Sequence, residues 1–279
     1  MKSLVVIPNV NKDEGLSVTD EVIDRFLTLG FNVYIGQDVG YKREGVFLYS
    51  DFPNDADLIV VIGGDGSVID ASRIAIERDI PILGVNLGRM GYLTEVEVDS
   101  ISELDKLVHG DYCITEKMLL SVELSDGVCE RFAVNDVAVS RDRFLHIADI
   151  KIEDSVGNAV KLRADGVILS TPQGSTAYSF SAGGPILAHD VEGVLLTPVS
   201  AHSFFNRSVL FNSTETIKVT NIGSLPLHVS VDGRCVASLE HMEYCSVKRA
   251  PKNVKILTFK RNSMFTSLFR KMRILGDID

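Results

Sequence analysis

Up to about residue 98, apolar residues follow two alternating periods. Short continuous apolar runs are typical of strands buried on both faces of a sheet, and apolar positions three and four residues apart are typical of helices. The predicted strands cover residues 3–8, 31–35, 58–62 and 81–85, and the predicted helices cover residues 18–29 and 67–78. Strands and helices that alternate at this spacing predict a Rossmann-like parallel sheet flanked by helices.

Beyond about residue 100 the pattern changes to short strands separated by turn signals such as Ser125-Asp126-Gly127, Val156-Gly157-Asn158 and Asp232-Gly233. Such a series predicts a mostly β, sandwich-like domain. The predicted strands cover residues 118–123, 130–140, 150–153, 161–163, 167–170, 216–220, 227–231 and 245–248.

The tail carries apolar residues at helical spacing from Phe265 to Met272, with Arg270, Lys271 and Arg273 among them. A short helix with a single apolar stripe usually faces a core, so we expect it to dock on the chain itself. A basic amphipathic helix can also bind a membrane surface, and this alternative stays open.

The turn from Gly63 to Ser67 follows a buried predicted strand and opens a predicted helix. Its glycines, Gly63, Gly64 and Gly66, allow a sharp turn and a close approach of the backbone to a ligand. The helix start offers free N–H groups suited to phosphate. Asp65 suits a different task, which is to accept a proton from an alcohol or to hold a metal ion. The alternative is that Asp65 only caps its own turn.

A second glycine segment, from Gly84 to Leu93, follows the next predicted strand. The carboxyl ends of neighbouring parallel strands meet at one edge of a sheet, so we expect this segment beside the first turn. Arg89 in it can offset phosphate charge. The alternative is a glycine-rich connector between domains.

In the second half, a predicted strand that ends at Ser170 runs into a turn crowded with small and hydroxyl residues. Such residues permit close approach of a flat ligand, and Tyr178 supplies a face for stacking. Upstream, Asn135 and Asp136 interrupt an apolar strand, and a ligand is one way to satisfy a buried polar pair. The alternative is a turn or bulge that pairs these side chains with backbone.

Composition excludes several classes of protein. The formal net charge of -10 argues against a general nucleic-acid binder. The four cysteines show no C-x-x-C spacing, so neither a structural zinc site nor a disulfide scaffold is expected. Apolar runs are too short to span a bilayer. We therefore expect a cytoplasmic protein that does not bind membranes.

Together these segments resemble the NAD kinase family. The Gly-Gly-Asp-Gly turn, the N-x-G-x-x-G-Y-L segment from Asn86, the Asn135–Asp136 pair and the run from Thr171 to Pro185 appear in that family's order and spacing. The resemblance covers about residues 60–210, with weaker similarity at both ends. The first motif is shared with lipid kinases and phosphofructokinase-like enzymes, whereas the long run is specific.

The resemblance implies a phosphofructokinase-like α/β domain of residues 1–98 with 255–279, and a β-rich domain of residues 99–254 that binds NAD. It implies that the protein phosphorylates the adenosine-ribose 2′-hydroxyl of NAD, with Mg²⁺ and with ATP or polyphosphate as donor, and that it forms a homodimer or homotetramer. The protein ligands of the metal stay unassigned.

The resemblance also implies the roles of individual residues. Asp65 matches the catalytic aspartate, Asn135 an adenine contact, and Asp136 a ribose contact. Thr176 and Ala177 match residues that line the adenine and nicotinamide subsites, and His202 lies in a segment that a neighbouring subunit often contributes. The expected substrate contacts are Gly63, Gly64, Gly66, Ser67, Asn86, Arg89, Asn135, Asp136, Arg163, Asp165, Gln173, Thr176, Ala177, Tyr178, Ser181 and His202.

The sequence departs from the family's pattern at three positions. Asp136 stands where glutamate is usual, Gln173 where Thr or Ser is usual, and Ser67 where threonine is common. None of these departures removes the proposed base. The shorter Asp136 is expected to shift the ribose contact and Gln173 to read the adenine edge differently, and the preference for NAD or NADH and the choice of donor stay open. Two other functions stay open, a lipid kinase that uses the same turn and a dinucleotide sensor without turnover.

Overall fold

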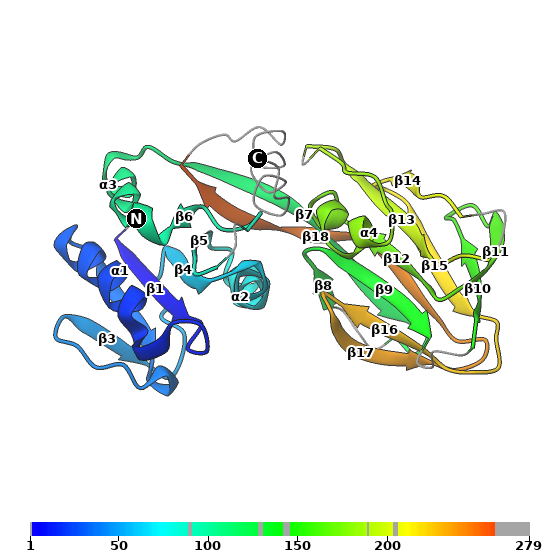
Figure 1. Ribbon diagram of the computed structural model, residues 1–279, viewed down its shortest axis with the longest axis horizontal. Coiled ribbons are helices and arrows are strands. Elements are labelled where there is room, and N and C mark those ends of the chain that lie inside the picture. Colours follow the sequence, from blue (N-terminus) through cyan, green and yellow to red (C-terminus); the bar gives the residue numbers. More distant parts are fainter. Residues whose placement is uncertain are drawn as a thin grey trace, which may run out of the picture. The chain divides into compact units, whose positions relative to one another are not determined.

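The computed structural model describes residues 2–88, 91–127, 131–141, 146–188, 190–202 and 206–259. The chain forms two compact units (Figure 1). The first, the α/β unit, comprises Met1–Glu116 and the described residues from Val254; the second, the β unit, comprises Lys117–Asn253. The predicted terminal helix around Phe265 lies outside the described residues.

The α/β unit contains a parallel sheet with strand order β5-β4-β1-β2-β3. β6 and the end of β18 both pair with β5 in parallel. The strands are β1 (Ser3–Pro8), β2 (Asn32–Gly36), β3 (Val46–Tyr49), β4 (Leu58–Gly63), β5 (Ile82–Asn86) and β6 (Val96–Glu97). The helices are η1 (Glu14–Leu16), α1 (Ser17–Thr28), η2 (Gln37–Val39), α2 (Asp65–Arg78), η3 (Val98–Asp105) and α3 (Lys106–His109).

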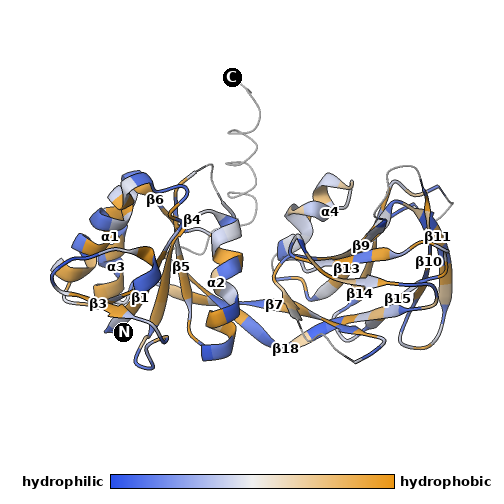
Figure 2. Ribbon diagram, turned by 90° about the horizontal axis from the view of Figure 1, so that it is seen from below, coloured by the Kyte–Doolittle hydropathy of each residue, from blue (hydrophilic) through white to orange (hydrophobic). Residues whose placement is uncertain are grey.

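Burial explains why these segments fold as the apolar pattern predicts. All six residues of β4 are buried, as expected for a strand that is covered on both faces. Val60 and Ile62 share a core with Phe26 of α1, while α2 packs against β4 and β5. Figure 2 shows α1 and α2 on opposite sides of the sheet, with β4 and β5 coloured as hydrophobic. The predicted α/β architecture is therefore confirmed.

The first unit continues past residue 98, where we expected the β-rich domain to begin. η3 and α3 follow, and they bury Ile101, Leu104 and Leu107 in the core of the α/β unit. Because these apolar side chains pack in that core, the segment belongs to the α/β unit.

The β unit consists of two antiparallel sheets that share one core. One sheet has the order β14-β13-β12-β9-β16-β17, and the other contains β11-β10-β15-β18 with β7 and β8. Alternate residues of β10, such as Ile150 and Ile152, face that core together with Val139 of β9 and Leu169 of β12. The predicted sandwich is therefore confirmed.

The strands of this unit have the following bounds. They are β7 (Cys113–Leu124), β8 (Arg131–Ala133), β9 (Asp136–Arg141), β10 (Ala148–Glu153), β11 (Ala159–Ala164), β12 (Gly166–Ser170), β13 (Gly193–Val199), β14 (Val209–Asn212), β15 (Thr216–Asn221), β16 (Leu227–Val231), β17 (Arg234–Leu239) and β18 (Tyr244–Thr258). The short helices are η4 (Gln173–Thr176) and α4 (Tyr178–Ser181). Within the described residues, no helix is both long enough and apolar enough to cross a bilayer.

One strand prediction is wrong in an informative way. The strand expected over residues 130–140 is two strands, β8 and β9, and the break falls at Val134 and Asn135. The carboxylate of Asp232 accepts hydrogen bonds from the backbone N–H groups of both residues, so these groups pair with a side chain instead of a strand.

Candidate functional site

The Gly-Gly-Asp-Gly turn joins β4 to α2. Gly63 ends the strand, and Asp65 is the first residue of the helix. A Cβ atom on Gly63 would lie 2.4 Å from the Oγ of Ser67, which is far too close. The turn therefore requires glycine at this position, as the sequence predicts.

The Asp65 carboxylate binds the backbone of the second glycine segment. Its Oδ2 accepts the N–H of Tyr92 and its Oδ1 accepts the N–H of Leu93, each at 2.9 Å. These bonds join Asp65 to residues 27 and 28 positions further along the chain, so the carboxylate does more than cap its own turn. Each carboxylate oxygen keeps a second lone pair for a hydroxyl group or a metal ion.

The second glycine segment lies beside the first turn, as predicted. The Leu87 N–H donates to the Gly63 carbonyl at 2.9 Å. A Cβ atom on Gly91 would lie 2.2 Å from Asp65 Oδ1, so only glycine allows this approach. The segment is therefore more than a connector, because its backbone contacts the Asp65 carboxylate directly.

Asn86 and Arg89 are the two residues of this segment that are expected to contact a substrate. Asn86 is buried, and its Nδ2 donates to Glu97 at 2.9 Å and to the Gly88 carbonyl at 3.2 Å. This side chain therefore orders its own turn, and its expected contact with a substrate stays a prediction. Arg89 lies outside the described residues.

Two residues at the end of β1 join this site, and the sequence did not single them out. Asn9 Nδ2 donates to Ser67 Oγ at 2.9 Å. The Nζ atom of Lys12 lies 3.5 Å from the position that a Cβ on Gly64 would occupy. Because β1 runs parallel to β4, both residues follow a strand end at the same sheet edge, and that position is the signal that points to them.

In the β unit, the Asn135–Asp136 pair packs against the turn after β12. The Thr171 N–H donates to the Asn135 carbonyl at 2.9 Å. A Cβ atom on Gly174 would lie 1.9 Å from that same carbonyl oxygen, so the turn must approach without a side chain. Six of the expected contacts lie on these two joined segments: Asn135, Asp136, Gln173, Thr176, Ala177 and Tyr178.

Asp136 is a buried carboxyl beside another carboxyl. It is 5% exposed, and burial together with the nearby Asp232 raises its pKa to about 7, although the Tyr178 backbone N–H opposes this shift. Asp232 itself accepts three backbone N–H groups, from Val134, Asn135 and Asp136. Asp232 therefore fixes the backbone that carries the pair.

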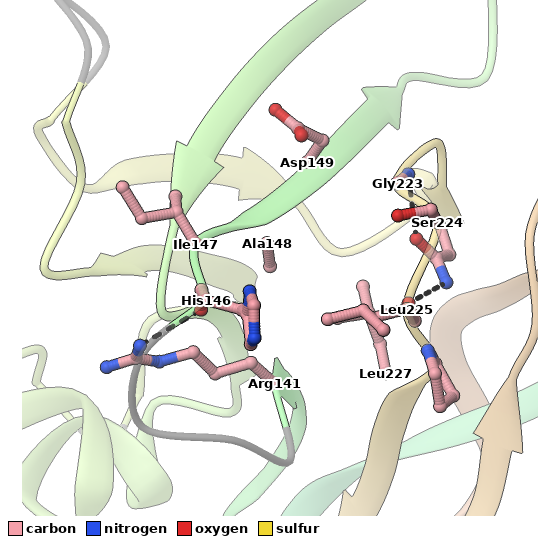
Figure 3. A pocket seen from close by; sticks show the side chains of 11 residues that line it. Arg141, His146, Ile147, Ala148, Asp149, Gly223, Ser224, Leu225 and Leu227 are labelled. Atoms are coloured by element: carbon pink, nitrogen blue, oxygen red, sulfur yellow. Dashed lines mark hydrogen bonds between the residues drawn. The ribbon is translucent and has the colours of Figure 1, made fainter.

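Three expected contacts gather elsewhere in the β unit. Asp165 forms an ion pair with Arg141 at 2.9 Å, and Arg163 forms one with Asp149 at 3.1 Å. The His202 N–H donates to the Arg163 carbonyl at 2.7 Å, and its side chain is exposed. Arg141 and Asp149 line a pocket of about 160 Å³ that Figure 3 shows from close by.

The remaining expected contacts have simple environments. Gly66 is exposed in the first turn of α2, and no side chain or backbone atom lies near the position of its missing Cβ. The Ser181 N–H donates to the Ala177 carbonyl at 3.3 Å and so closes the single turn of α4. Among the described residues, no group of three His, Cys, Asp or Glu side chains is placed to hold a metal ion.

Two sequence profiles match the chain along most of its length. The profile described as "ATP-NAD kinase N-terminal domain" matches residues 4–112, and the one described as "ATP-NAD kinase C-terminal domain" matches residues 134–259. The chain belongs to the NAD kinase family. It is accordingly a kinase, and the function suggested by the sequence motifs is confirmed at this level.

Relatives within the NAD kinase family align over nearly the whole chain. An NAD kinase of Caldanaerobacter subterraneus subsp. tengcongensis is 31% identical over 281 residues, which cover 98% of this chain and 99% of that protein. An NAD kinase of Natranaerobius thermophilus is 32% identical over 284 residues, which cover 98% of each chain. Both protein units described above are therefore present in these NAD kinases.

Solved structures of NAD kinases share the fold. A yeast NADH kinase complexed with NADH aligns with a TM-score of 0.84 at 21% identity, covering 100% of this chain and 89% of that chain. An NAD kinase from Archaeoglobus fulgidus in complex with ATP aligns with a TM-score of 0.74 at 26% identity, covering 99% and 100%.

Proposed function

We propose that this kinase phosphorylates the adenosine-ribose 2′-hydroxyl of NAD to give NADP, with ATP or another phosphoryl donor. Family membership supports NAD and ATP as substrates. The single observation that carries the chemistry is the carboxylate of Asp65, which two backbone N–H groups hold in place at a glycine turn.

Asp65 acts as the general base in this proposal. A ribose hydroxyl is a poor nucleophile at neutral pH, and a fixed carboxylate oxygen can take its proton as the oxygen attacks the terminal phosphorus. The new O–P bond forms as the bond from phosphorus to the donor's leaving oxygen breaks. Phosphoryl transfer depends mostly on positioning and charge neutralisation, so a base that cannot rotate away is an advantage.

One cation and the start of a helix at the turn fit a donor with several phosphates. The ammonium group of Lys12 lies over the turn beside Gly64, and the start of α2 presents backbone N–H groups. We assign Asn9 the task of holding Ser67 in place through their 2.9 Å hydrogen bond. The net charge of the protein is negative and would repel the phosphates of the donor, and these local groups offset that repulsion.

Asp65 also fits a magnesium ion that is shared with the substrate. Mg²⁺ keeps several waters and usually binds one or two carboxylates together with substrate phosphates, and one such carboxylate stands at this turn. When bound, the ion would neutralise charge on the donor phosphates. Asp65 would hold it through a lone pair that the Tyr92 and Leu93 amides leave free.

The proposal assigns the dinucleotide to the β unit. Asn135, Asp136 and the turn from Gln173 to Tyr178 form a joined surface of polar and small residues, and Tyr178 is 46% exposed for stacking. We extend the proposal to a homodimer or homotetramer in the cytoplasm, with small molecules as substrates and no binding of nucleic acid or membranes. The arrangement of Arg163, Asp165 and His202 in a separate cluster is consistent with contacts to a substrate of a neighbouring subunit.

A donor panel tests the proposed function directly. Purified protein with NAD and Mg²⁺ is given ATP, other nucleoside triphosphates or polyphosphate, and NADP is detected with an NADP-specific dehydrogenase. We expect NADP with at least one donor and none when Mg²⁺ is removed with a chelator. Binding of NAD without NADP formation from any donor would instead indicate a dinucleotide sensor.

A further inference from the structure

Thr94 carries a buried hydroxyl group directly after the second glycine segment. Its Oγ1 atom has no hydrogen-bond partner within the part of the chain that the structure describes. A buried hydroxyl without a partner lowers the stability of a fold, because its lost bond to water is not replaced. Such a group in a native protein needs an explanation, and one explanation is a bond that forms when the substrates are present.

Packing against β5 fixes the direction of this hydroxyl. Both Cα and Cγ2 of Thr94 lie 2.9 Å from the point that a Cβ atom on Gly84 would occupy, and the N–H of Glu95 donates to the Gly84 carbonyl at 2.9 Å. The methyl group of Thr94 therefore lies against β5. The hydroxyl lies on the side of Gly91, because Oγ1 is 2.5 Å from the point that a Cβ atom on Gly91 would occupy.

The Asp65 carboxylate reaches the same place. Its Oδ1 lies 2.2 Å from that point beside Gly91, so the threonine hydroxyl and the carboxylate are close neighbours. Oδ1 accepts one hydrogen bond, from the Leu93 N–H, and it can accept a second. No hydrogen bond joins the Thr94 hydroxyl to Asp65 in the structure, but bonds at catalytic groups often shorten only when substrates bind. A small movement of this segment would complete the bond.

We propose that Thr94 is a positioning residue whose hydroxyl donates a hydrogen bond to Asp65 Oδ1 when the substrates bind; this inference rests on the proposed function. The Leu93 N–H and the Thr94 O–H then occupy Oδ1, whereas Oδ2 accepts one bond, from Tyr92, and keeps a lone pair. Oδ2 is therefore the atom that takes the proton of the ribose 2′-hydroxyl. Thr94 keeps its own proton throughout, and it acts only by holding the carboxylate at the angle that proton transfer requires.

Steady-state rates with NAD, Mg²⁺ and the preferred donor test this role. Thr94→Val keeps the shape of the side chain but lacks the donor, so we expect kcat to fall about ten- to a hundredfold, the usual effect of losing a hydrogen bond to a charged group, with KM for NAD little changed. Thr94→Ser keeps the hydroxyl and should retain most of the turnover. Thr28→Val, the same substitution at an exposed position of α1, should leave kcat and KM unchanged.

Two further measurements separate a positioning role from a structural one. Thr94→Val should unfold at no lower denaturant concentration than the unaltered protein, because it removes a buried hydroxyl for which the described residues supply no partner. When it is combined with Asp65→Asn, it should slow turnover further by no more than about twofold, because a residue that acts through Asp65 then has no carboxylate left to position.

Several results would overturn this inference. One is a kcat of Thr94→Val within about threefold of that of the unaltered protein. Others are equal losses in Thr94→Val and Thr94→Ser, or a full further loss when Thr94→Val is added to Asp65→Asn. A less stable Thr94→Val would show that the hydroxyl serves the fold instead. In all these cases the unaltered protein still makes NADP, whereas the proposed function fails if the unaltered protein makes no NADP from any donor.

Discussion

Asp65→Asn is expected to lower turnover by about 10²–10⁴-fold, the usual contribution of a positioned general base. The carboxamide cannot take the hydroxyl proton, and it can accept only one of the two N–H groups, of Tyr92 and Leu93, that the carboxylate now binds. Affinity for NAD should change little, because most of the residues expected to contact the substrates lie in the β unit. Initial rates and NAD titrations of the same preparation measure both effects.

The same variant should also lose some stability. The unmatched N–H group costs about 1–3 kcal/mol, so the α/β unit should unfold at lower denaturant concentration. Glu77→Gln is the matched control, because it makes the same chemical change at an exposed position on the same helix. Turnover of Asp65→Asn within a few-fold of the control would show that this carboxylate only orders the glycine segment.

The second large effect is on stability and its dependence on pH. Burial and Asp232 raise the pKa of Asp136 from 3.8 to about 7 in the folded protein. Between these values the folded state holds a proton that the unfolded state has released, so the stability of the protein falls as the pH rises from about 4 to about 7. Asp136→Asn removes this loss and should stabilise the β unit above pH 7 by up to about 4 kcal/mol.

Denaturant unfolding at pH 5 and pH 8 measures this difference. The advantage of Asp136→Asn over the unaltered protein should be clearly larger at pH 8 than at pH 5. Glu240→Gln, at an exposed position of the same unit, should show no such change between the two pH values. An advantage that is equal at both values would mean that Asp136 is ionised to the same extent in folded and unfolded chains. In the proposed function Asp136 contacts NAD, and groups that serve a substrate often lower the stability of the fold.

The apolar pattern was sufficient to predict the parallel sheet, because continuous buried runs such as β4 have few other interpretations. It missed β13, an interior strand of the six-stranded sheet, because the run contains Pro198, and proline usually marks a strand edge or end. The pattern also predicts one strand where the structure has β8 and β9, because no local signal shows that the distant Asp232 carboxylate separates them.

That carboxylate, Asp232, is the clearest case of what the sequence could not reveal. The Asp232-Gly233 dipeptide is a turn signal in the sequence, and it joins β16 to β17. The backbone groups that Asp232 binds lie 96 to 98 residues earlier in the chain. Such a contact depends on the pairing of β9 with β16, so it emerges only when the sheet is assembled.

The Asp65 site was more accessible to sequence reasoning, because its parts follow the strand order of a parallel sheet. Two glycine segments after adjacent strands were expected at one edge, and the bonds from Tyr92 and Leu93 to Asp65 show this contact. Lys12 was missed because it follows β1, which is close in space but has no glycine motif of its own.

The most direct test of the proposed chemistry is the position of the new phosphate. NAD and its analogue with 2′-deoxyadenosine are incubated separately with the protein, Mg²⁺ and the preferred donor, and the products are examined by phosphorus NMR. The proposal predicts a 2′-phosphate monoester on the adenosine ribose of NAD and no transfer to the deoxy analogue. A phosphorylated deoxy analogue, or a phosphate on any other hydroxyl of NAD, would contradict it.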